Sequence, residues 1–218
     1  MPAPVAVAFV LLVLAVAIIQ ISLASYAYRR LGLAAPWAYG LLIASILGSR
    51  FNIPIAHLRG GTTYEAVVVR VYGMWYVIPR AVRHGVRVLA VNVGGAIIPV
   101  VLATFLIIHA GLGWAALVAV AAVTGIVHAV ARVVPGVGIV VPTLVPPVSA
   151  VAIAWATGVG AISALAYVAG TLGTLIGGDL LNLRRLRDLD APVLSIGGGG
   201  TFDGIFVTGI LAVLLAAL

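Results

Sequence analysis

The chain has 218 residues, of which 64% are hydrophobic and only 8% are charged. Soluble domains carry about a quarter charged residues, so this composition excludes a soluble globular protein and predicts a single integral membrane domain, 1–218. The formal charge is +7, and all twelve basic residues are arginines in short polar segments. That pattern is typical of cytoplasmic loops, and no nucleic-acid partner is expected.

The sequence contains no cysteine, which excludes disulfides, thiolate catalysis and zinc–thiolate sites. Its four histidines are scattered and show no ligand spacing. We therefore predict neither a metal nor a cofactor.

Apolar runs separated by glycine, proline or arginine predict about seven transmembrane helices. They are residues 5–25, 34–49, 89–109, 113–131, 137–157, 160–181 and 199–218. No basic residue precedes the first run, which favours a retained span over a cleaved signal. The second run is short, and a re-entrant or interfacial segment is its alternative. The predicted fold is an all-α, polytopic bundle in the cell membrane.

The arginines predict the orientation of the bundle. Ten of them fall in the connections 50–88, 132–136 and 183–198, which lie on one side if the seven spans alternate: Arg50, Arg59, Arg70, Arg80, Arg83, Arg87, Arg132, Arg184, Arg185 and Arg187. Only Arg29 and Arg30 fall opposite. By the positive-inside rule the arginine-rich side is cytoplasmic, and the C-terminus is outside.

The longest polar connection, 57–87, is predicted to be a small cytoplasmic β-hairpin inserted into the bundle. β-Branched and aromatic residues flank a turn at Gly73, and Pro79 ends the second strand. The alternative is an interfacial amphipathic segment held by Trp75 and Tyr76.

Two stretches, 92–99 and 135–147, are predicted to break helices inside apolar sequence. Broken helices expose backbone groups, which the membrane tolerates where they line a cavity or bind ions. GAIIP (95–99) and GIVVP (138–142) also align, which suggests a parallel repeat. These features favour an ion-coupled transporter or channel as the alternative function.

Two of the five acidic residues, Asp179 and Asp203, stand where hydrocarbon is expected, which is costly enough to demand a reason. They flank the connection 183–198, so both are expected at the cytoplasmic face on neighbouring helices. Two carboxylates about 3 Å apart cannot both ionise, and such a pair can activate water and protonate a leaving amine. The pair therefore provides the minimum apparatus for aspartyl hydrolysis of a peptide bond.

Glycines surround both aspartates, and glycine lets a substrate backbone approach closely. Substrate contacts are expected at Gly198, Gly199, Gly200 and Thr201. The alternative for Gly170, Gly173 and Gly177 is a small-residue ridge for helix packing. Asp203 has the alternative role of a helix N-cap. A helix that begins there spans only about 24 Å, short of the roughly 30 Å hydrocarbon core.

Four segments resemble a prokaryotic multi-pass membrane family of unknown function. They are TLGTLIGGDLLNL (171–183), SIGGGGTFDGIFVTGI (195–210), NVGGAIIP (92–99) and VPGVGIVVPTLVPP (134–147). This resemblance covers most of the chain and implies no activity.

The arrangement around the aspartates resembles the presenilin, signal-peptide-peptidase and prepilin-peptidase type of aspartyl intramembrane protease. In both, an aspartate ends one helix, a cytoplasmic loop follows, and a second aspartate comes after a glycine and before aromatic and small residues. The resemblance implies that Asp179 takes the first catalytic position and Asp203 the second, with a transmembrane helix as substrate. The proline element of those proteases has no downstream counterpart, so Pro142 is the candidate to replace it.

The leading prediction is thus a diaspartyl intramembrane peptidase that needs no cofactor and has the lipid bilayer and a transmembrane helix as its partners. In the transport alternative, the aspartates carry ions or protons. A third interpretation is a structural or partner-binding membrane protein, in which Arg184, Arg187, Asn182 or backbone amides satisfy the two aspartates.

Overall fold

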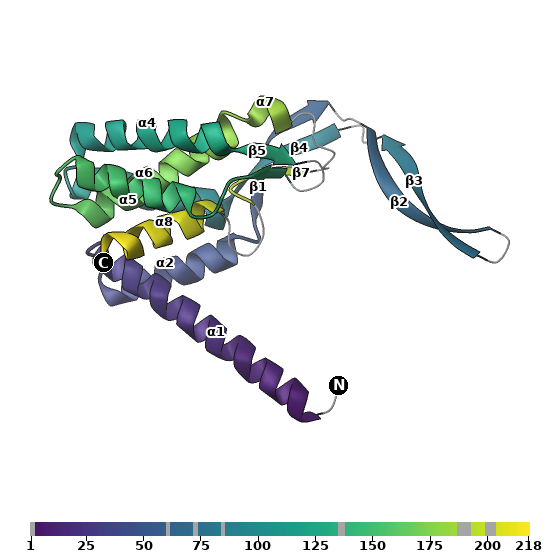
Figure 1. The fold of residues 1–218 in the computed structure, drawn as a ribbon, viewed down its shortest axis with the longest axis horizontal. Coiled ribbons are helices and arrows are strands. Elements are labelled where there is room, and N and C mark those ends of the chain that lie inside the picture. The colour runs from purple at the N-terminus through teal and green to yellow at the C-terminus, as the bar shows by residue number, and fades with distance from the viewer. Residues whose placement is uncertain are drawn as a thin grey trace.

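The computed structural model describes residues 3–59, 62–71, 74–83, 86–134, 138–186, 193–198 and 204–218. They form a mostly helical fold with small sheets (Figure 1). The helices are α1 (Ala3–Arg30), α2 (Ala35–Gly48), α3 (Ile98–His109), α4 (Gly113–Val130), α5 (Val145–Ala156), α6 (Ile162–Thr174), α7 (Leu183–Leu186) and α8 (Gly204–Ala216). Two π-helical segments adjoin them: η1 (Val93–Ile97) precedes α3, and η2 (Leu175–Leu180) follows α6.

Helix α6 forms the centre of the bundle, with α3, α4, α5 and α8 packed around it. Residues 164–171 are all buried. Small residues on α6 allow close approach: a Cβ on Gly173 would lie 2.6 Å from Val123 Cγ1 of α4, and one on Gly170 would lie 3.2 Å from Thr208 Cγ2 of α8. The helix-packing interpretation of these two glycines is confirmed.

Helix α1 diverges from the bundle (Figure 1). Near its C-terminal end Ala27 and Tyr28 are buried, and this part packs against α2 and α8. Further towards the N-terminus, side chains such as Leu12 and Ile18 are more than half exposed. The exposed part of α1 is therefore almost entirely apolar.

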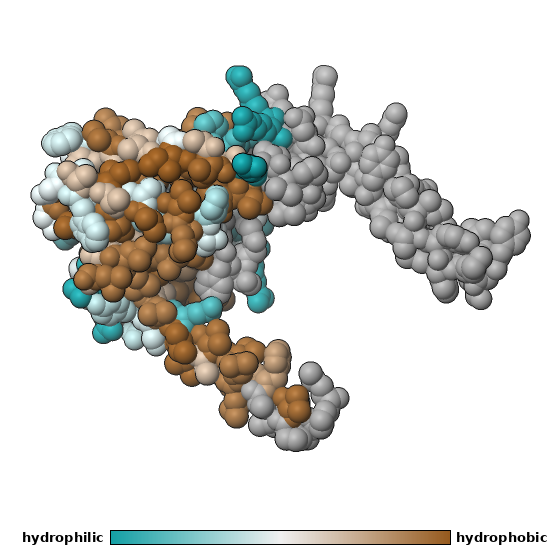
Figure 2. All heavy atoms as spheres, viewed as in Figure 1, coloured by the Kyte–Doolittle hydropathy of each residue, from teal (hydrophilic) through white to brown (hydrophobic). Residues whose placement is uncertain are grey.

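Three helical stretches are long and apolar enough to cross a membrane: Leu11–Arg30, Gly113–Val130 and Ile162–Arg185. Shorter apolar helices cover Ala35–Gly48, Val93–His109, Val145–Ala156 and Gly204–Ala216. Each of the seven predicted spans thus contains an apolar helix. Figure 2 shows hydrophobic residues over α1 and the bundle, with hydrophilic ones gathered near α7.

The strands are β1 (Asn52–Arg59), β2 (Thr62–Val71), β3 (Met74–Arg83), β4 (Val86–Asn92), β5 (Arg132–Val134), β6 (Gly138–Val140) and β7 (Val193–Ile196). Strands β2 and β3 pair antiparallel as the predicted hairpin, with Val71 opposite Met74. The prediction that Pro79 ends the second strand was wrong, because Pro79 lies within β3 opposite Ala66 and the pairing continues to Arg83. The hairpin projects away from the helices (Figure 1).

The prediction of an all-α bundle with one hairpin was wrong in its strand content. Strands β1, β4 and β7 form a three-stranded sheet in that order, in which β4 pairs antiparallel with β1 and parallel with β7. Strands β5 and β6 form a further antiparallel pair. The β-region therefore extends beyond the predicted insertion 57–87, because β1 begins at Asn52 and β4 ends at Asn92.

The predicted helix breaks and the parallel repeat were also wrong. Residues 92–99 start a helix after β4, and 135–147 include β6 and the start of α5, so spans predicted at 89–109 and 137–157 begin later than expected. GAIIP (95–99) is helical, whereas GIVVP (138–142) begins as a strand. Both strings are β-branched and apolar, so their local pattern suits either structure.

The three arginine-bearing connections meet at one end of the bundle, hereafter the sheet end. Leu194 of β7 is buried and packs with Leu58 of β1, Leu89 of β4, Ile139 of β6 and Leu183 of α7. The C-terminal end of α1, which carries the other two arginines, lies at the opposite end beside the C-terminus (Figure 1). The connections thus share one side, as the arginine pattern predicts.

Candidate functional site at the sheet end

Asp179 lies in η2, where α6 widens into a π-helix at Gly177 and Gly178. Gly177 permits this because η2 runs against α4: a Cβ there would lie 2.4 Å from the backbone oxygen of Thr124. Gly178 is also buried but has more room, since its nearest neighbours, Val127 and Val141, would be 3.8 Å from a Cβ. π-Helical turns often occur at functional sites, and this one carries the half-buried Asp179.

The buried Asn182 satisfies the backbone of this π-turn. Its Nδ2 donates to the carbonyl oxygens of Gly177 at 2.9 Å and Gly178 at 2.8 Å. Its Oδ1 accepts from Arg185 Nη1 at 3.2 Å. His128 Nδ1 of α4 lies 3.3 Å from the Gly177 oxygen and 3.4 Å from Asn182 Nδ2. Two carbonyls face the amide, so its NH₂ group and not its oxygen must point to them.

The side chain of Asp179 is bound to the connection between β7 and α8. The backbone N–H of Gly197 donates to Asp179 Oδ2 at 2.9 Å. Gly197 is buried and has φ +69°, a backbone conformation that glycine adopts at little cost. A Cβ at Gly197 would also lie 2.6 Å from Ala96 Cβ in η1. The glycine thus brings η1, η2 and the β7–α8 connection together.

A second asparagine organises η1. Asn92, buried at the end of β4, caps η1 by accepting from the N–H of Gly95 at 2.7 Å, while its Nδ2 donates to the Ser49 oxygen at 2.7 Å and to Asn52 Oδ1 at 3.1 Å. Ser195 Oγ of β7 also donates to Asn52 Oδ1. This polar cluster joins α2, β1, η1 and β7 next to the glycine that binds Asp179.

Helices α6 and α8 run antiparallel. The contact between them shows which residue of α8 lies at the same height along the bundle as η2. Gly170 faces Thr208 in the close contact already described. One helical turn before Thr208 is Gly204, and one turn after Gly170 is Thr174. The first described residue of α8 is therefore level with the start of η2.

The predicted site residues fare differently. Asp203, Gly199, Gly200 and Thr201 lie outside the described residues, as does Arg187. Gly198 is exposed and directly follows the glycine that binds Asp179. Pro142 is exposed in the connection after β6, where its carbonyl accepts from the N–H of Val145, and the preceding Val141 neighbours Gly178.

The interpretation that the Asn182 side chain satisfies Asp179 was wrong. The Asn182 amide binds two carbonyl oxygens of η2 and the side chain of Arg185 instead. The backbone-amide interpretation does describe the bond from Gly197. His128, which the sequence did not single out, contacts η2. Sequence analysis could have singled out Asn92 and Asn182, because a side-chain amide among apolar residues needs hydrogen-bond partners when it is buried.

Within the described part of the chain, no three His, Cys, Asp or Glu side chains lie close enough together to hold a metal ion. The described residues of the site supply carboxylate, amide, imidazole, guanidinium and backbone groups.

This fold defines a helical protein with apolar helices, a small sheet at one end, and a polar site where the two meet. The chain belongs to a family described as protein of unknown function (DUF1614), whose model matches residues 46–215. The matched region contains η1, η2, β7 and all but the last residue of α8, whereas α1 lies before it. The predicted resemblance to a family of unknown function is confirmed. No curated protein and no solved structure matches the chain.

Proposed function

We propose that this chain is a multi-pass membrane protein that hydrolyses peptide bonds of transmembrane helices, with Asp179 and Asp203 as its acid–base pair. Membrane placement is supported by the outer surface of the bundle. Ile108, Trp114 and Leu117 are 77%, 71% and 73% exposed. Such side chains on several outer helices suit lipid better than water.

We assign the sheet end to the cytoplasmic side, because ten of the twelve arginines belong to its connections. The absence of native cysteine allows a direct test with single cysteines labelled by a membrane-impermeant maleimide. His57→Cys on β1 should react only from the cytoplasmic face, and Gly160→Cys, between α5 and α6, only from the other face. Both positions are exposed. Labelling of both from the same side would contradict this topology.

The observation that carries the peptidase proposal is the hydrogen bond from Gly197 to Asp179. Gly197 belongs to the short connection that contains Asp203, which is covalently joined to the first described residue of α8. That residue, Gly204, is level with the start of η2. One carboxylate is thus bound to the connection that carries the other, and both chain segments approach the same level of the bundle.

The reaction requires one ionised and one protonated carboxyl group. The carboxylate accepts a proton from water while the resulting hydroxyl adds to the peptide carbonyl carbon, and the carboxylic acid protonates the carbonyl oxygen. The newly protonated aspartate then donates its proton to the amide nitrogen as the C–N bond breaks, while the other carboxylate takes a proton from a hydroxyl of the tetrahedral intermediate, which restores one acid and one carboxylate. Every proton comes from water or from the two aspartates.

The glycines near Asp179 differ in the space that they leave for a substrate backbone. Gly177 is closed off by α4, whereas a Cβ on Gly178 would make only ordinary contacts, at 3.8 Å, with Val127 and Val141. Gly198 is exposed, although Ser195 fills the direction of its missing Cβ. We assign the approach of the substrate to Gly178 and the exposed face of Gly198, with Gly199, Gly200, Thr201 and Pro142 as further contacts. Gly178→Ala should therefore fold normally but cleave more slowly, whereas Gly177→Ala should be destabilised.

The principal test uses purified full-length protein in liposomes with tagged transmembrane-helix substrates. Asp179→Asn and Asp203→Asn should each lower the cleavage rate by about a hundredfold or more. Glu65→Gln, which makes the same change on β2, should not. Full activity in either aspartate variant would refute the dyad.

A second test needs no substrate. Cysteines at 179 and 203 alone should form a disulfide on mild oxidation, which requires Cβ atoms within about 4.5 Å. The control pair is 179 with 160, at opposite ends of α6 and η2, roughly 25 Å apart along the helix. Failure of the first pair to cross-link in folded protein would exclude a shared catalytic water.

An ion-coupled transporter is the second candidate. The predicted helix breaks no longer support it, because residues 92–99 and 138–147 lie at helix starts on the sheet end and not within helices. A solute flux through sealed vesicles that depends on Asn92 or Pro142 would favour transport over hydrolysis.

A further inference from the structure

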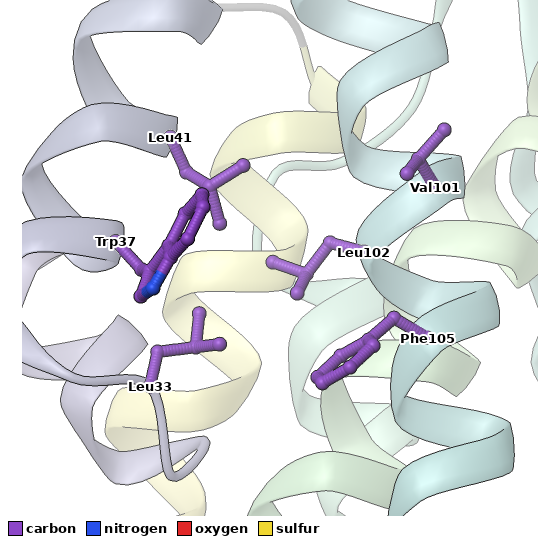
Figure 3. Close-up of a pocket in the computed structure, with 6 residues that line it drawn as sticks. All are labelled: Leu33, Trp37, Leu41, Val101, Leu102 and Phe105. Carbon is purple, nitrogen blue, oxygen red and sulfur yellow. The ribbon is translucent and has the colours of Figure 1, made fainter.

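Helices α2 and α3 touch at the sheet end and part towards the other end. At the sheet end, a Cβ on Gly94 of η1 would lie 2.0 Å from the Ser45 oxygen of α2, so the two backbones are in direct contact. Towards the opposite end a groove of about 400 Å³ opens between the helices. One wall carries Leu33, Trp37 and Leu41, and the other carries Val101, Leu102 and Phe105 (Figure 3).

All six side chains that line this groove are hydrophobic, which favours an apolar occupant. Trp37 is 70% exposed and Val101 is 61% exposed, so the groove opens on the outer surface of the bundle. In a membrane-spanning protein that surface faces lipid. The occupant that follows is an acyl chain, and this step rests on the membrane placement in the proposed function but not on the peptidase chemistry.

Two arginines precede the groove wall by a short turn of the chain. Arg29 and Arg30 end α1, both are exposed, and the turn after them leads to Leu33 on the groove wall. Tyr26 positions Arg30: Arg30 Nε donates to the tyrosine hydroxyl oxygen at 2.8 Å, and the guanidinium carbon lies 5.3 Å from the ring centroid. A guanidinium has five N–H donors, and its fork matches phosphate oxygens.

The position of this pair also needs an explanation. The other ten arginines belong to the connections at the sheet end, and Arg29 and Arg30 lie at the end where the positive-inside rule predicts few cations. An anionic headgroup would compensate their charge. In Figure 3 the indole nitrogen of Trp37 is on the part of the ring nearer to Leu33. A tryptophan at the membrane interface places its polar edge towards the headgroups in this way.

We propose that an anionic phospholipid binds here, with one acyl chain in the groove between α2 and α3 and its phosphate against Arg29 and Arg30. The site combines an apolar groove with a cationic pair on the turn that leads to its wall.

The test measures quenching of Trp37 fluorescence by lipids with brominated acyl chains. Full-length protein is reconstituted in phosphatidylcholine containing a small, equal fraction of dibrominated phosphatidylglycerol or dibrominated phosphatidylcholine. The Trp37→Phe variant isolates the Trp37 signal from that of the other tryptophans. Brominated phosphatidylglycerol should quench Trp37 at a several-fold lower fraction than brominated phosphatidylcholine. Each arginine contributes about a fivefold preference.

Matched variants separate the two halves of the site. The Arg29→Gln/Arg30→Gln double variant should lose the preference but keep quenching by brominated phosphatidylcholine. Val101→Phe should fill the groove and reduce quenching by both lipids. Leu211→Phe, in the separate groove between α1 and α8, should change neither result.

The outcomes also separate this proposal from the proposed function. Trp114 of α4 reports membrane placement, because its exposure does not depend on the groove. If Trp114 is quenched but Trp37 shows no headgroup preference, the lipid site is wrong and the membrane placement stands. A preference that survives in the double arginine variant overturns the site as well. If neither tryptophan is quenched, the membrane placement itself fails, and the lipid site with it.

Discussion

Replacing Asn182 with alanine should destabilise the fold more than any other single polar change near Asp179. The side chain is fully buried and donates to the carbonyl oxygens of Gly177 and Gly178. Alanine leaves both oxygens without this donor, and an unsatisfied buried acceptor costs about 1–3 kcal/mol. The expected loss is therefore about 2–6 kcal/mol, a large part of the roughly 5–15 kcal/mol that stabilises a typical protein.

The assay is reversible unfolding of the purified protein in mixed micelles, followed by circular dichroism as the denaturing detergent is increased. Asn182→Asp is the informative companion, because it keeps the shape but presents only acceptors to the two carbonyls when ionised. It should be at least as unstable as the alanine variant. His128→Ala should lose less, about 0.5–1.5 kcal/mol, since its contact with Gly177 is 3.3 Å long. An alanine variant of Asn182 within about 0.5 kcal/mol of the wild type would refute the proposed role.

Two further changes test the other helix junctions in the same assay. Gly94→Ala should cost about 3 kcal/mol or more, because its Cβ would meet the backbone oxygen of Ser45. Gly40→Ala, on the same pair of helices but with nothing within 4 Å, should be neutral or stabilising by up to about 1 kcal/mol. Equal effects would contradict the close contact. Asn92→Ala should lose about 1–2 kcal/mol through the cap to Gly95 alone, and an unchanged unfolding midpoint would show that the cap is dispensable.

The positions of the helices could be predicted from the sequence because each is a long apolar run bounded by glycine, proline or arginine. The hairpin could be predicted for a similar reason, since its strands are adjacent and joined by a short turn. In both cases the information is local. The end of α2 at Gly48 and the start of α4 at Gly113 fall within a residue of the predicted limits.

The three-stranded sheet could not be predicted in this way. Strand β4 pairs with β7 about a hundred residues later, and residues 193–196 read as part of a polar connection. Leu89–Val91 read instead as the start of a membrane helix, because a short apolar run is compatible with either structure. Only the partner strand distinguishes the two, and nothing in the local pattern identifies it.

The candidate site was predicted in part for the same reason. An aspartate in apolar sequence is conspicuous because burial of its charge is costly, so Asp179 could be singled out. Its partner in the structure is a backbone N–H, and every residue other than proline has one. Gly197 therefore carried no distinctive chemical signal, although its φ of +69° explains why a glycine is required there.

The lengths of the helices explain why polar groups concentrate at the sheet end. Helices α2, α5 and α8 have 12 to 14 residues, or about 18–21 Å, which is shorter than the hydrocarbon core of a bilayer. If they lie in the membrane, strands and turns must complete the crossing.

Non-helical backbone is stable at that depth only where protein groups or water satisfy its hydrogen bonds. Asn92 and Asn182 meet this requirement. Asn92 binds the Gly95 N–H of η1 and the Ser49 oxygen, and Asn182 binds the carbonyl oxygens of Gly177 and Gly178 in η2. Among the described residues, Asp179 accepts the Gly197 N–H, and a carboxylate has two oxygens and about four acceptor positions, so its capacity exceeds this contact. The π-turns explain the two asparagines, and the remaining capacity of the Asp179 carboxylate is consistent with the chemistry that we propose for it.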